Sequence, residues 1–449
     1  MYRLPIIPES IVVHLGSPDS DSRNIRVNFI EYIKNVASGE LYPNWPREAL
    51  IANIYAIISF ALNRVYNEWY RSKGYLFDIT SSSAYDQSFV EDRQFFETIY
   101  NLVDEIFPAY IIREGQVQPL FAAYCDGKNR TCNGLSQWGS VSLANQGWKA
   151  DRILKYYYGN LIQIVEDVSI SPFTESYPGV ELSLGDAGDM IRLLKVQLNR
   201  IGQNYPAIPA LIHDTIYFDV EMEEAVRVFQ KSFSLPVTGK IDRITWYKIK
   251  YYYNAVKKIT NLYSEGISKE EVTLKYPMVL KEGDQGTYIR DLHYYLSVIS
   301  CFDDSIPNVD MKRDVFDSDT KENVLAFQRK FSLPATGEVG VTTWNQIQRV
   351  YDDYRKMIPK GCRYTLNEFF SGRYLSIGME GEDILNLQRF LYMICENSHE
   401  IPGVIVSGKY DSLTEQSVRF LQQKYGLEAS GVVTATTWFE IVEQAKNIS

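Results

Sequence analysis

The sequence is poor in the residues that usually build metal sites and disulfide frameworks. Among 449 residues it has 5 cysteines and 4 histidines, most of them far apart in the chain. An odd and scattered set of cysteines defines no disulfide framework, and isolated histidines do not have metal-ligand spacing. The sequence therefore predicts no metal site and no cofactor.

Clusters of positive charge and long apolar runs are also missing. The formal net charge is −10 and no basic block occurs, which argues against a nucleic-acid surface and against electrostatic capture of an acidic polymer. The longest apolar segment, residues 49–62, contains Asn53 and has the length of a buried helix rather than a membrane span. The N-terminal MYRLPIIPES shows no secretory signal pattern.

Aromatic residues are abundant by contrast. They make up 14% of the chain and include 33 tyrosines. Tyrosine and tryptophan faces can stack on sugar rings, so this content is compatible with a glycan-binding groove. For most of these residues, packing in cores and interfaces with a polar tip is the expected role.

One pattern occurs three times in the C-terminal part of the chain. In each copy a G-x-x-G element is followed by a glutamine, 42, 42 and 41 residues after the second glycine. A turn glycine follows 9 residues later and a tryptophan 7 residues after that, in all three copies. These positions are Gly188, Gly286 and Gly381; Gln230, Gln328 and Gln422; Gly239, Gly337 and Gly431; Trp246, Trp344 and Trp438. Such constant spacing indicates an internal repeat of one folded unit.

Each copy is predicted to be a small module of three helices. In the first copy the G-x-x-G turn leads into a helix with apolar residues at helical spacing. A variable loop follows, then a second helix ending near Leu235 and a turn at residues 238–239. Thr245 is predicted to cap a last helix in which Trp246 is a core anchor. The tyrosine- and lysine-rich residues 246–259 are predicted to be a spacer between modules.

This repeat closely resembles the three-helix peptidoglycan-binding domain that many bacterial wall hydrolases carry. The resemblance covers each copy from end to end and places the modules at residues 178–255, 276–355 and 370–449. It implies peptidoglycan as the partner, through its glycan strands and stem peptides. The repeated residues are predicted to be mostly scaffold, with the binding groove lined by variable loops.

The first 168 residues have a different character. IRVNFIEYIKNV mixes strand-like and helical patterns, ALIANIYAIISFALNRVYNEWY is a long apolar helix, and GYLFDIT and PLFAAYCDG are predicted short strands. The predicted fold class is an α+β domain, residues 1–168, followed by three small all-α modules.

Two segments of this α+β domain carry a second resemblance. VASGELYPNWPREALIANIYA is similar to the valine-valine-alanine-x-glutamate-methionine-proline segment and alanine-rich helix of the stage II sporulation protein D family, which are peptidoglycan lytic transglycosylases. Leu41 and Tyr42 stand where methionine is usual. Two further family segments, glycine-x-serine-glutamine-x-glycine and isoleucine-leucine-x-x-tyrosine-tyrosine, are matched by Gly134, Ser136, Gln137 and Gly139, and by Ile153, Leu154, Tyr157 and Tyr158. With the modules, the plan is similar to that of clostridial spore cortex-lytic enzymes.

The resemblance implies that Glu40 is the catalytic acid, since it matches the family's catalytic glutamate; otherwise Glu40 would be an exposed loop carboxylate. Ser136 and Gln137 are implied to hydrogen-bond the substrate or the acid. Trp138 either stacks on sugar or belongs to the core. Further groove candidates are Gln87, Tyr85, Tyr124 and Asp126, and Asp126 is the candidate second carboxylate if the enzyme is a hydrolase.

Glu48 is predicted to have a structural role instead. It follows Pro46 at the start of the apolar helix, where a carboxylate offsets unpaired amides and the helix dipole, which lowers its pKa. A second acid is not required by a lytic transglycosylase, because the C6 hydroxyl of the sugar attacks in place of water. A hydrolase normally uses two carboxylates.

Two departures from the family concern metal binding and thiols. Several family members bind zinc through histidine and cysteine, whereas residues 83–87 here keep the glutamine and have neither thiol nor imidazole. Cys125 and Cys132 bracket the polar loop DGKNRT and either pair as a small disulfide or remain reduced thiols; pairing is favoured outside a reducing cytosol. The domain begins almost at Met1, so control by removal of an N-terminal prosegment is not expected.

Two functions are compatible with these patterns. The first is a peptidoglycan lytic transglycosylase, by resemblance one of spore cortex, anchored by three binding modules and located at the spore or cell wall. Deposition by the mother cell would explain the absence of a visible signal. The second is a non-catalytic wall-binding or spore-structural protein. Retention of Glu40 together with Ser136 and Gln137 favours the enzyme.

Overall fold

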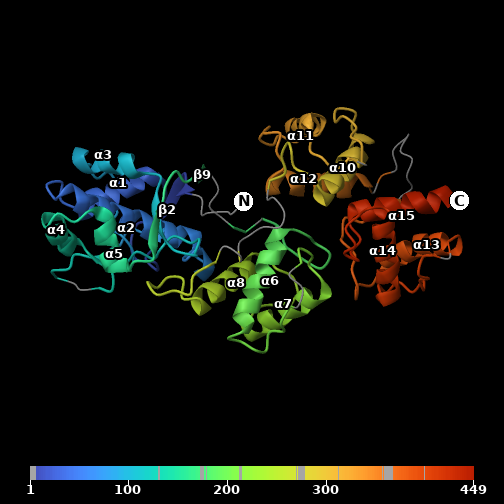
Figure 1. Ribbon diagram of the computed structural model, residues 1–449, viewed down its shortest axis with the longest axis horizontal. Coiled ribbons are helices and arrows are strands. Elements are labelled where there is room, and N and C mark those ends of the chain that lie inside the picture. The colour runs from blue at the N-terminus through green and yellow to red at the C-terminus, as the bar shows by residue number, and fades with distance from the viewer. Residues whose placement is uncertain are drawn as a thin grey trace.

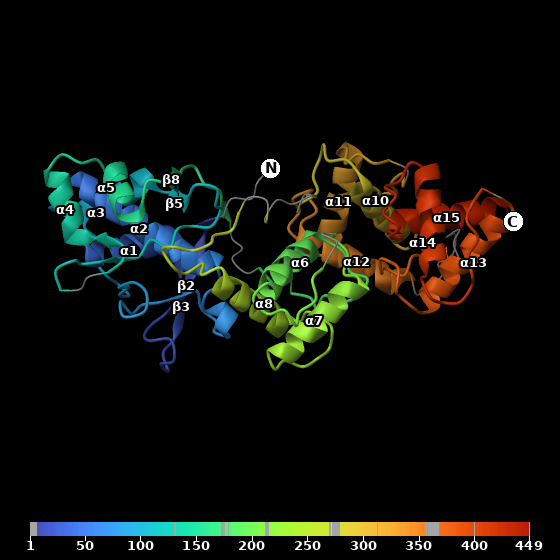
Figure 2. The same cartoon turned by 60° about the horizontal axis from the view of Figure 1, so that its bottom comes forward.

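The computed structural model describes residues 7–129, 132–171, 176–177, 179–211, 215–268, 271, 279–311, 313–355, 357, 368–398 and 400–448. The predicted module limits at residues 178, 276 and 449 lie outside these ranges. Figures 1 and 2 show the mixed α and β domain at one end and three helical modules after it.

The N-terminal domain is built around α2 (Arg47–Tyr66), in which every residue from Ala49 to Val65 is buried. Four helices surround it: α1 (Phe29–Glu40), α3 (Glu97–Ile106), α4 (Gln137–Asn145) and α5 (Ala150–Tyr158). Among the described residues, one helix is long and apolar enough to cross a membrane, and it is this segment, Arg47–Lys73, with 94% of its apolar window inside the protein. The prediction of a buried core helix is confirmed.

The strands of this domain are short. β2 (Ser10–His14) pairs antiparallel with β3 (Asn24–Asn28) and parallel with β4 (Ile79–Thr80). β5 (Tyr110–Arg113) pairs with β8 (Ile162–Val165), β6 (Tyr124–Cys125) with β7 (Leu135–Ser136), and β1 (Ile7–Pro8) with β9 (Ile170–Ser171). The mixture is compatible with the predicted α+β class, and the two predicted short strands are present over two residues each.

Each module has the three predicted helices. Module 1 contains α6 (Asp189–Gly202), α7 (Val220–Ser232) and α8 (Arg243–Val256). Module 2 contains α10 (Thr287–Ser300), α11 (Ser318–Lys330) and α12 (Val341–Arg355). Module 3 contains α13 (Glu382–Glu396), α14 (Ser412–Lys424) and α15 (Ala435–Ile448).

The repeated glutamine is a scaffold residue. Gln230 Nε2 donates to Lys240 O at 2.8 Å and to Thr245 Oγ1 at 3.2 Å, while its Oε1 accepts from Gly239 N at 2.9 Å. Gln328 and Gln422 make the corresponding bonds. This one buried amide ties the second helix to the turn and to the third helix, which explains the constant spacing.

Two predictions about module 1 are wrong. Thr245 does not cap the third helix, because Asp242 is the N-cap and accepts from Thr245 N at 2.7 Å. The predicted spacer is largely α8 itself, which packs on α6 and on the short helix η1 (Arg71–Lys73) of the N-terminal domain. Trp246 and Trp438 are buried as predicted, whereas Trp344 is only partly buried.

Candidate functional site

Glu40 is the last residue of α1, so it is not the exposed loop carboxylate that was the alternative to a catalytic acid. The residue is half-buried, and its Oε1 accepts from Ser88 N at 2.9 Å. Oε2 has almost no exposed surface and no hydrogen bond of ordinary geometry. Burial raises the pKa of Glu40, and the raise is opposed in part by nearby groups of Ser88, Tyr124, Arg93 and Gln137. A carboxyl that keeps its proton closer to neutral pH is suited to act as a general acid.

The hydroxyl of Tyr124 interacts with this carboxyl, and Gln87 positions it. Gln87 is fully buried; its Nε2 donates to Tyr124 Oη at 3.1 Å and to Ile57 O at 3.0 Å, and its Oε1 accepts from Tyr32 Oη at 3.0 Å. Gln87 is therefore placed behind Tyr124 and not on an open groove surface. Burial, with the Glu40 charge second, holds the pKa of Tyr124 well above its usual value, so its hydroxyl stays protonated.

Ser136 and Gln137 have different surroundings. Ser136 is the N-cap of α4, and its Oγ accepts from Gly139 N at 3.0 Å. A Cβ on Gly127 would lie 1.8 Å from Ser136 Oγ, and one on Gly139 would lie 2.2 Å from Tyr157 Oη. The glycines thus make room for the serine. Gln137, the first residue of α4, is buried with its side chain close enough to Glu40 to lower the pKa of Glu40.

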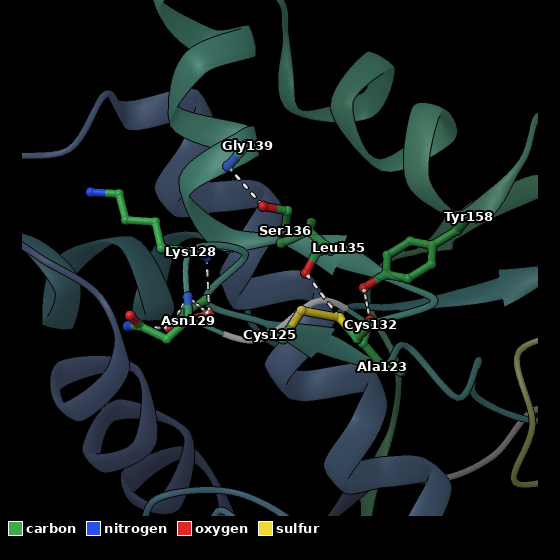
Figure 3. The surroundings of a disulfide bond; sticks show 10 residues. Ala123, Cys125, Lys128, Asn129, Cys132, Leu135, Ser136, Gly139 and Tyr158 are labelled. Carbon is green, nitrogen blue, oxygen red and sulfur yellow. Dashed lines mark hydrogen bonds between the residues drawn. A yellow bond between two sulfur atoms is a disulfide. The ribbon is translucent and has the colours of Figure 1, made fainter.

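Cys125 and Cys132 form a disulfide, which resolves the two alternatives left open by the sequence. Figure 3 shows the bond beside Ser136 and Tyr158, at the base of the loop that carries Lys128. Within this loop the carboxylate of Asp126 accepts from Lys128 N, Asn129 N and Asn129 Nδ2 at 2.8–3.2 Å. Asp126 therefore organises the turn.

Trp138 belongs to an aromatic cluster beside the acid. Its ring centroid lies 4.9 Å from that of Trp45 and 5.8 Å from that of Tyr42, and Lys128 Nζ lies 3.3 Å from it. Tyr42 is 56% exposed, whereas Trp45 is buried. Tyr42 and Trp45 were missed as site residues, although both stand within five positions of Glu40 in a segment that carries the resemblance described above. Tyr42 and Trp138 together present aromatic surface to solvent.

Tyr85 is the candidate least connected to this cluster. Its side chain is 53% exposed, and its carbonyl accepts from Arg64 Nη2 at 3.5 Å. Its ring is close enough to Tyr75 to influence the pKa of that residue. Within the described ranges no hydrogen bond, ion pair or ring contact joins Tyr85 to Glu40, Tyr124 or Gln137, so the structure brings those three together without it.

Glu48 has the structural role that was predicted, but for a different helix. Its own helix, α2, has Pro46 at the N-cap and no side-chain cap bond. Glu48 Oε2 accepts from Ala150 N, the first residue of α5, at 2.9 Å, and Lys149 Nζ lies 3.0 Å from Oε1. The Ala150 amide is the main reason that the pKa of Glu48 is lowered.

Arg93 was not identified from the sequence, because it lies outside every matched segment. Its guanidinium lies over Gly39, next to Glu40. In the part of the chain that the structure describes, no group of three or more histidine, cysteine, aspartate or glutamate side chains is placed to hold a metal ion.

Comparison with known proteins identifies the C-terminal modules. Residues 187–249, 286–347 and 380–439 each match the family model of a peptidoglycan binding domain, and each segment spans the first two helices of its module and the start of the third. The matches support peptidoglycan as a partner and association with the cell wall. No curated protein and no solved structure matches the chain.

Proposed function

We propose that this protein is a peptidoglycan lytic transglycosylase in which Glu40 is the single acid and base. The proposal is carried by the state of the Glu40 carboxyl. One oxygen is held by Ser88 N, the other is shielded near Tyr124 and Gln137 with no hydrogen bond of ordinary geometry, and burial raises the pKa. A structural carboxylate would have its oxygens paired, as Glu48 does.

The chemistry needs one proton delivered and one proton recovered. Protonated Glu40 gives its proton to the glycosidic oxygen between N-acetylmuramic acid and N-acetylglucosamine, and the bond from that oxygen to C1 breaks. The C6 hydroxyl of the muramoyl sugar then attacks C1 and returns its proton to the Glu40 carboxylate. The product is a 1,6-anhydro ring, no water is consumed, and the acid is regenerated.

The other carboxylates around the site are engaged elsewhere. Asp86 is buried and bound by Arg64 Nε at 2.8 Å, Tyr70 Oη at 2.5 Å and Thr80 Oγ1 at 2.7 Å. Asp126 holds its own turn, and Glu48 holds α5. This arrangement favours one acid over the carboxylate pair of a hydrolase.

The rest of the chain supports a glycan substrate. Tyr42 and Trp138 offer aromatic surface next to the acid, and Tyr124 and Gln137 offer hydrogen-bonding groups. The three modules would hold the enzyme on the wall, which shortens the search for the next bond by keeping glycan at high effective concentration. Spore cortex is the proposed form of the substrate, on the resemblance to cortex-lytic enzymes.

Digestion of purified cortex peptidoglycan, with mass spectrometry of the soluble fragments, tests this proposal. The full chain should release fragments with 1,6-anhydro-muramic ends, Glu40→Gln should release about 10²–10⁴-fold fewer, and the control Glu48→Gln should retain activity. Equal activity of Glu40→Gln would overturn the assignment of the acid. Reducing ends would indicate a hydrolase, and binding without fragments a non-catalytic wall protein.

A further inference from the structure

Arg93 lies directly beside the proposed acid because Gly39 leaves room for it. A Cβ on Gly39 would be 2.2 Å from Arg93 Nη1 and 2.3 Å from Cζ. No other residue type at position 39 would allow the guanidinium to lie there without moving it. Gly39 therefore has a steric role. Its missing side chain makes room for the Arg93 guanidinium next to Glu40, the residue that follows Gly39 in the chain.

The Arg93 guanidinium has few partners. Its Nη2 donates to Ser88 Oγ at 3.5 Å, the outer limit for a hydrogen bond, and its Nε is shielded from solvent with no partner. Among the described residues Arg93 makes no salt bridge. A guanidinium carries five N–H donors, and a shielded one usually meets a carboxylate or several acceptors. The free donors are therefore available to an anion that is brought to the site.

The segment that carries Arg93 is fixed to α1 at several points. Asn35 donates to Val90 O at 2.8 Å and accepts from Val90 N at 3.1 Å. Phe96 N donates to Ser38 Oγ at 3.4 Å, and Ser88 N donates to Glu40 itself. The guanidinium is thus held in place relative to the acid by bonds on both sides of it, as a recognition group should be.

We propose that Arg93 binds a carboxylate of the muramoyl unit, so that the enzyme selects anionic glycan over neutral polymers of N-acetylglucosamine. The inference rests on the proposed function. Two sources supply the same chemistry: the lactyl group of a muramoyl sugar without a stem peptide, or a carboxylate of the stem peptide itself. A bidentate pair with either would use donors that have no partner in the protein.

Binding at Arg93 would also act on the acid. The positive charge of Arg93 lowers the pKa of Glu40, which works against an acid that must start protonated. A bound carboxylate neutralises that charge and lets the burial of Glu40 raise its pKa further. Recognition of the substrate and loading of the proton would therefore be coupled.

Isothermal titration of the full chain in a Glu40→Gln background tests this without turnover. The probes are the N-acetylglucosamine–N-acetylmuramic acid disaccharide, its neutral lactyl methylamide, and the disaccharide with its stem peptide. The acid form should bind about tenfold more tightly than the methylamide, and Arg93→Gln should abolish this difference. Tight binding of the peptide-bearing form alone would assign the stem-peptide carboxylate.

Equal binding of acid, peptide-bearing and methylamide forms, or an unchanged preference in Arg93→Gln, would overturn the proposal. Arg26→Gln is the matched control, because Arg26 is exposed and lies on β3, which precedes the opposite end of α1 from Glu40. Because these are equilibrium measurements, they separate failure at Arg93 from failure of the proposed reaction, which the digestion tests.

A pH profile adds a readout that a merely structural role would not move. The pH at which kcat/KM falls on the alkaline side reports the pKa of the acid in the free enzyme, and it should be higher in Arg93→Gln than in the wild type. The pH at which kcat falls reports the enzyme–substrate complex and should be unchanged. Arg93→Lys should restore the pH at which kcat/KM falls towards its wild-type value. If kcat/KM of Arg93→Gln falls at the same alkaline pH as that of the wild type, the coupling between Arg93 and the pKa of Glu40 is contradicted.

Discussion

At the scale of single residues, Glu40 and Glu48 have opposite electrostatic surroundings although eight positions separate them. Glu40 is shielded and its pKa is raised by burial. Glu48 accepts from a helix N-terminal amide and its pKa is lowered. Two carboxyl groups whose pKa values are pushed apart take different roles. In the proposed reaction Glu40 carries a proton to the substrate, whereas Glu48 remains charged and holds the fold.

Glu40→Gln is expected to leave the fold at least as stable as wild type near neutral pH. The pKa of the Glu40 carboxyl is higher in the folded protein than in the unfolded chain, where it is about 4.3. The wild type therefore loses stability as the pH rises from this value through the pKa of the folded protein. Glutamine does not titrate and keeps an oxygen for Ser88 N. The melting temperatures of wild type and variant should coincide near pH 4, and that of the variant should be the higher at pH 7. A variant less stable at pH 7 would contradict the raised pKa.

Glu48→Ala is expected to destabilise the protein by about 1 kcal/mol, the usual value of a helix cap. Because the folded pKa of Glu48 is lowered, its contribution is complete above the unfolded pKa and is lost as pH falls through the folded pKa. Denaturant unfolding at pH 7 and at acidic pH measures both effects. Lys149→Ala is the control: its ammonium is exposed, and its removal should cost less than about 0.5 kcal/mol.

The identity of the proposed acid was accessible from the sequence, but its setting was not. Pro43 indicates a break before the long helix, and the alternative role of Glu40 was that of an exposed loop carboxylate. The structure continues α1 to Glu40 because Val36, Ala37 and Ser38 are buried against the domain. Gly39 is needed for the approach of Arg93, which lies 54 positions further on; such a contact leaves no local pattern in a single sequence.

At the scale of elements, the three modules differ at one buried position of their first helix. Seven residues after the second glycine stand Lys195, His293 and Gln388, all buried. Lys195 Nζ donates to Thr215 Oγ1 at 2.9 Å, His293 Nδ1 lies 3.0 Å from Arg313 O, and Gln388 Nε2 donates to Lys409 O at 2.8 Å. Each side chain holds the variable loop of its own module, by a different chemistry.

His293→Gln is expected to remove a pH dependence from module 2. Burial lowers the pKa of His293, with Asp317, Asp310 and Arg313 as the charged neighbours. The neutral ring therefore contributes stability that is complete above the unfolded pKa of about 6.5 and is lost as pH falls towards the folded value. Glutamine, the residue of module 3, supplies a donor for the loop carbonyl and does not titrate.

Melts of the full chain between pH 5 and pH 8 would measure this effect. The melting temperature of the transition in which module 2 unfolds should decrease on acidification, and the decrease should be larger in the wild type than in His293→Gln. Gln388→Ala, at the same position of module 3, is the matched control, because it loses the loop bonds without changing a titratable group. Parallel pH curves for wild type and His293→Gln would show that His293 does not titrate in this range.

The three helices of each module could be predicted from the repeat, but in module 1 the second helix ends at Ser232 rather than near Leu235, and the third begins at Arg243. The spacing of glycines, glutamine and tryptophan reflects the hydrogen bonds of Gln230 and its equivalents, so the helices follow from it. The cap was misassigned because Asp242 and Thr245 both favour N-caps. The hydroxyl of Thr245 accepts a hydrogen bond from Gln230 Nε2, and helix-capping preferences do not take such a tertiary contact into account.

At the scale of the whole molecule, the chain is not four separate units joined by spacers. Leu262 belongs to the core of the N-terminal domain, and Val117 belongs to the core of module 1. Modules 2 and 3 share one core, and buried Asp291 of module 2 accepts from Thr436 N at 2.9 Å and from Tyr374 Oη at 2.8 Å. These contacts involve residues outside the repeat pattern, so repeat spacing could not predict them.

The N-terminal domain and module 1 are expected to unfold as one cooperative unit. Asn254 Nδ2 donates to Asn67 O at 2.8 Å, and Lys250 Nζ lies 2.7 Å from Oε2 of buried Glu68. Lys250→Met leaves that carboxylate without its cation, which costs roughly 3 kcal/mol and should lower the melting temperature of this unit by about 6–12 °C. Hydrogen-exchange mass spectrometry should show α2 and α8 losing protection together. The control is Lys240→Met, which removes the exposed ion pair with Glu181 and should change the melting temperature little. Loss of protection in α8 alone would show that module 1 unfolds independently.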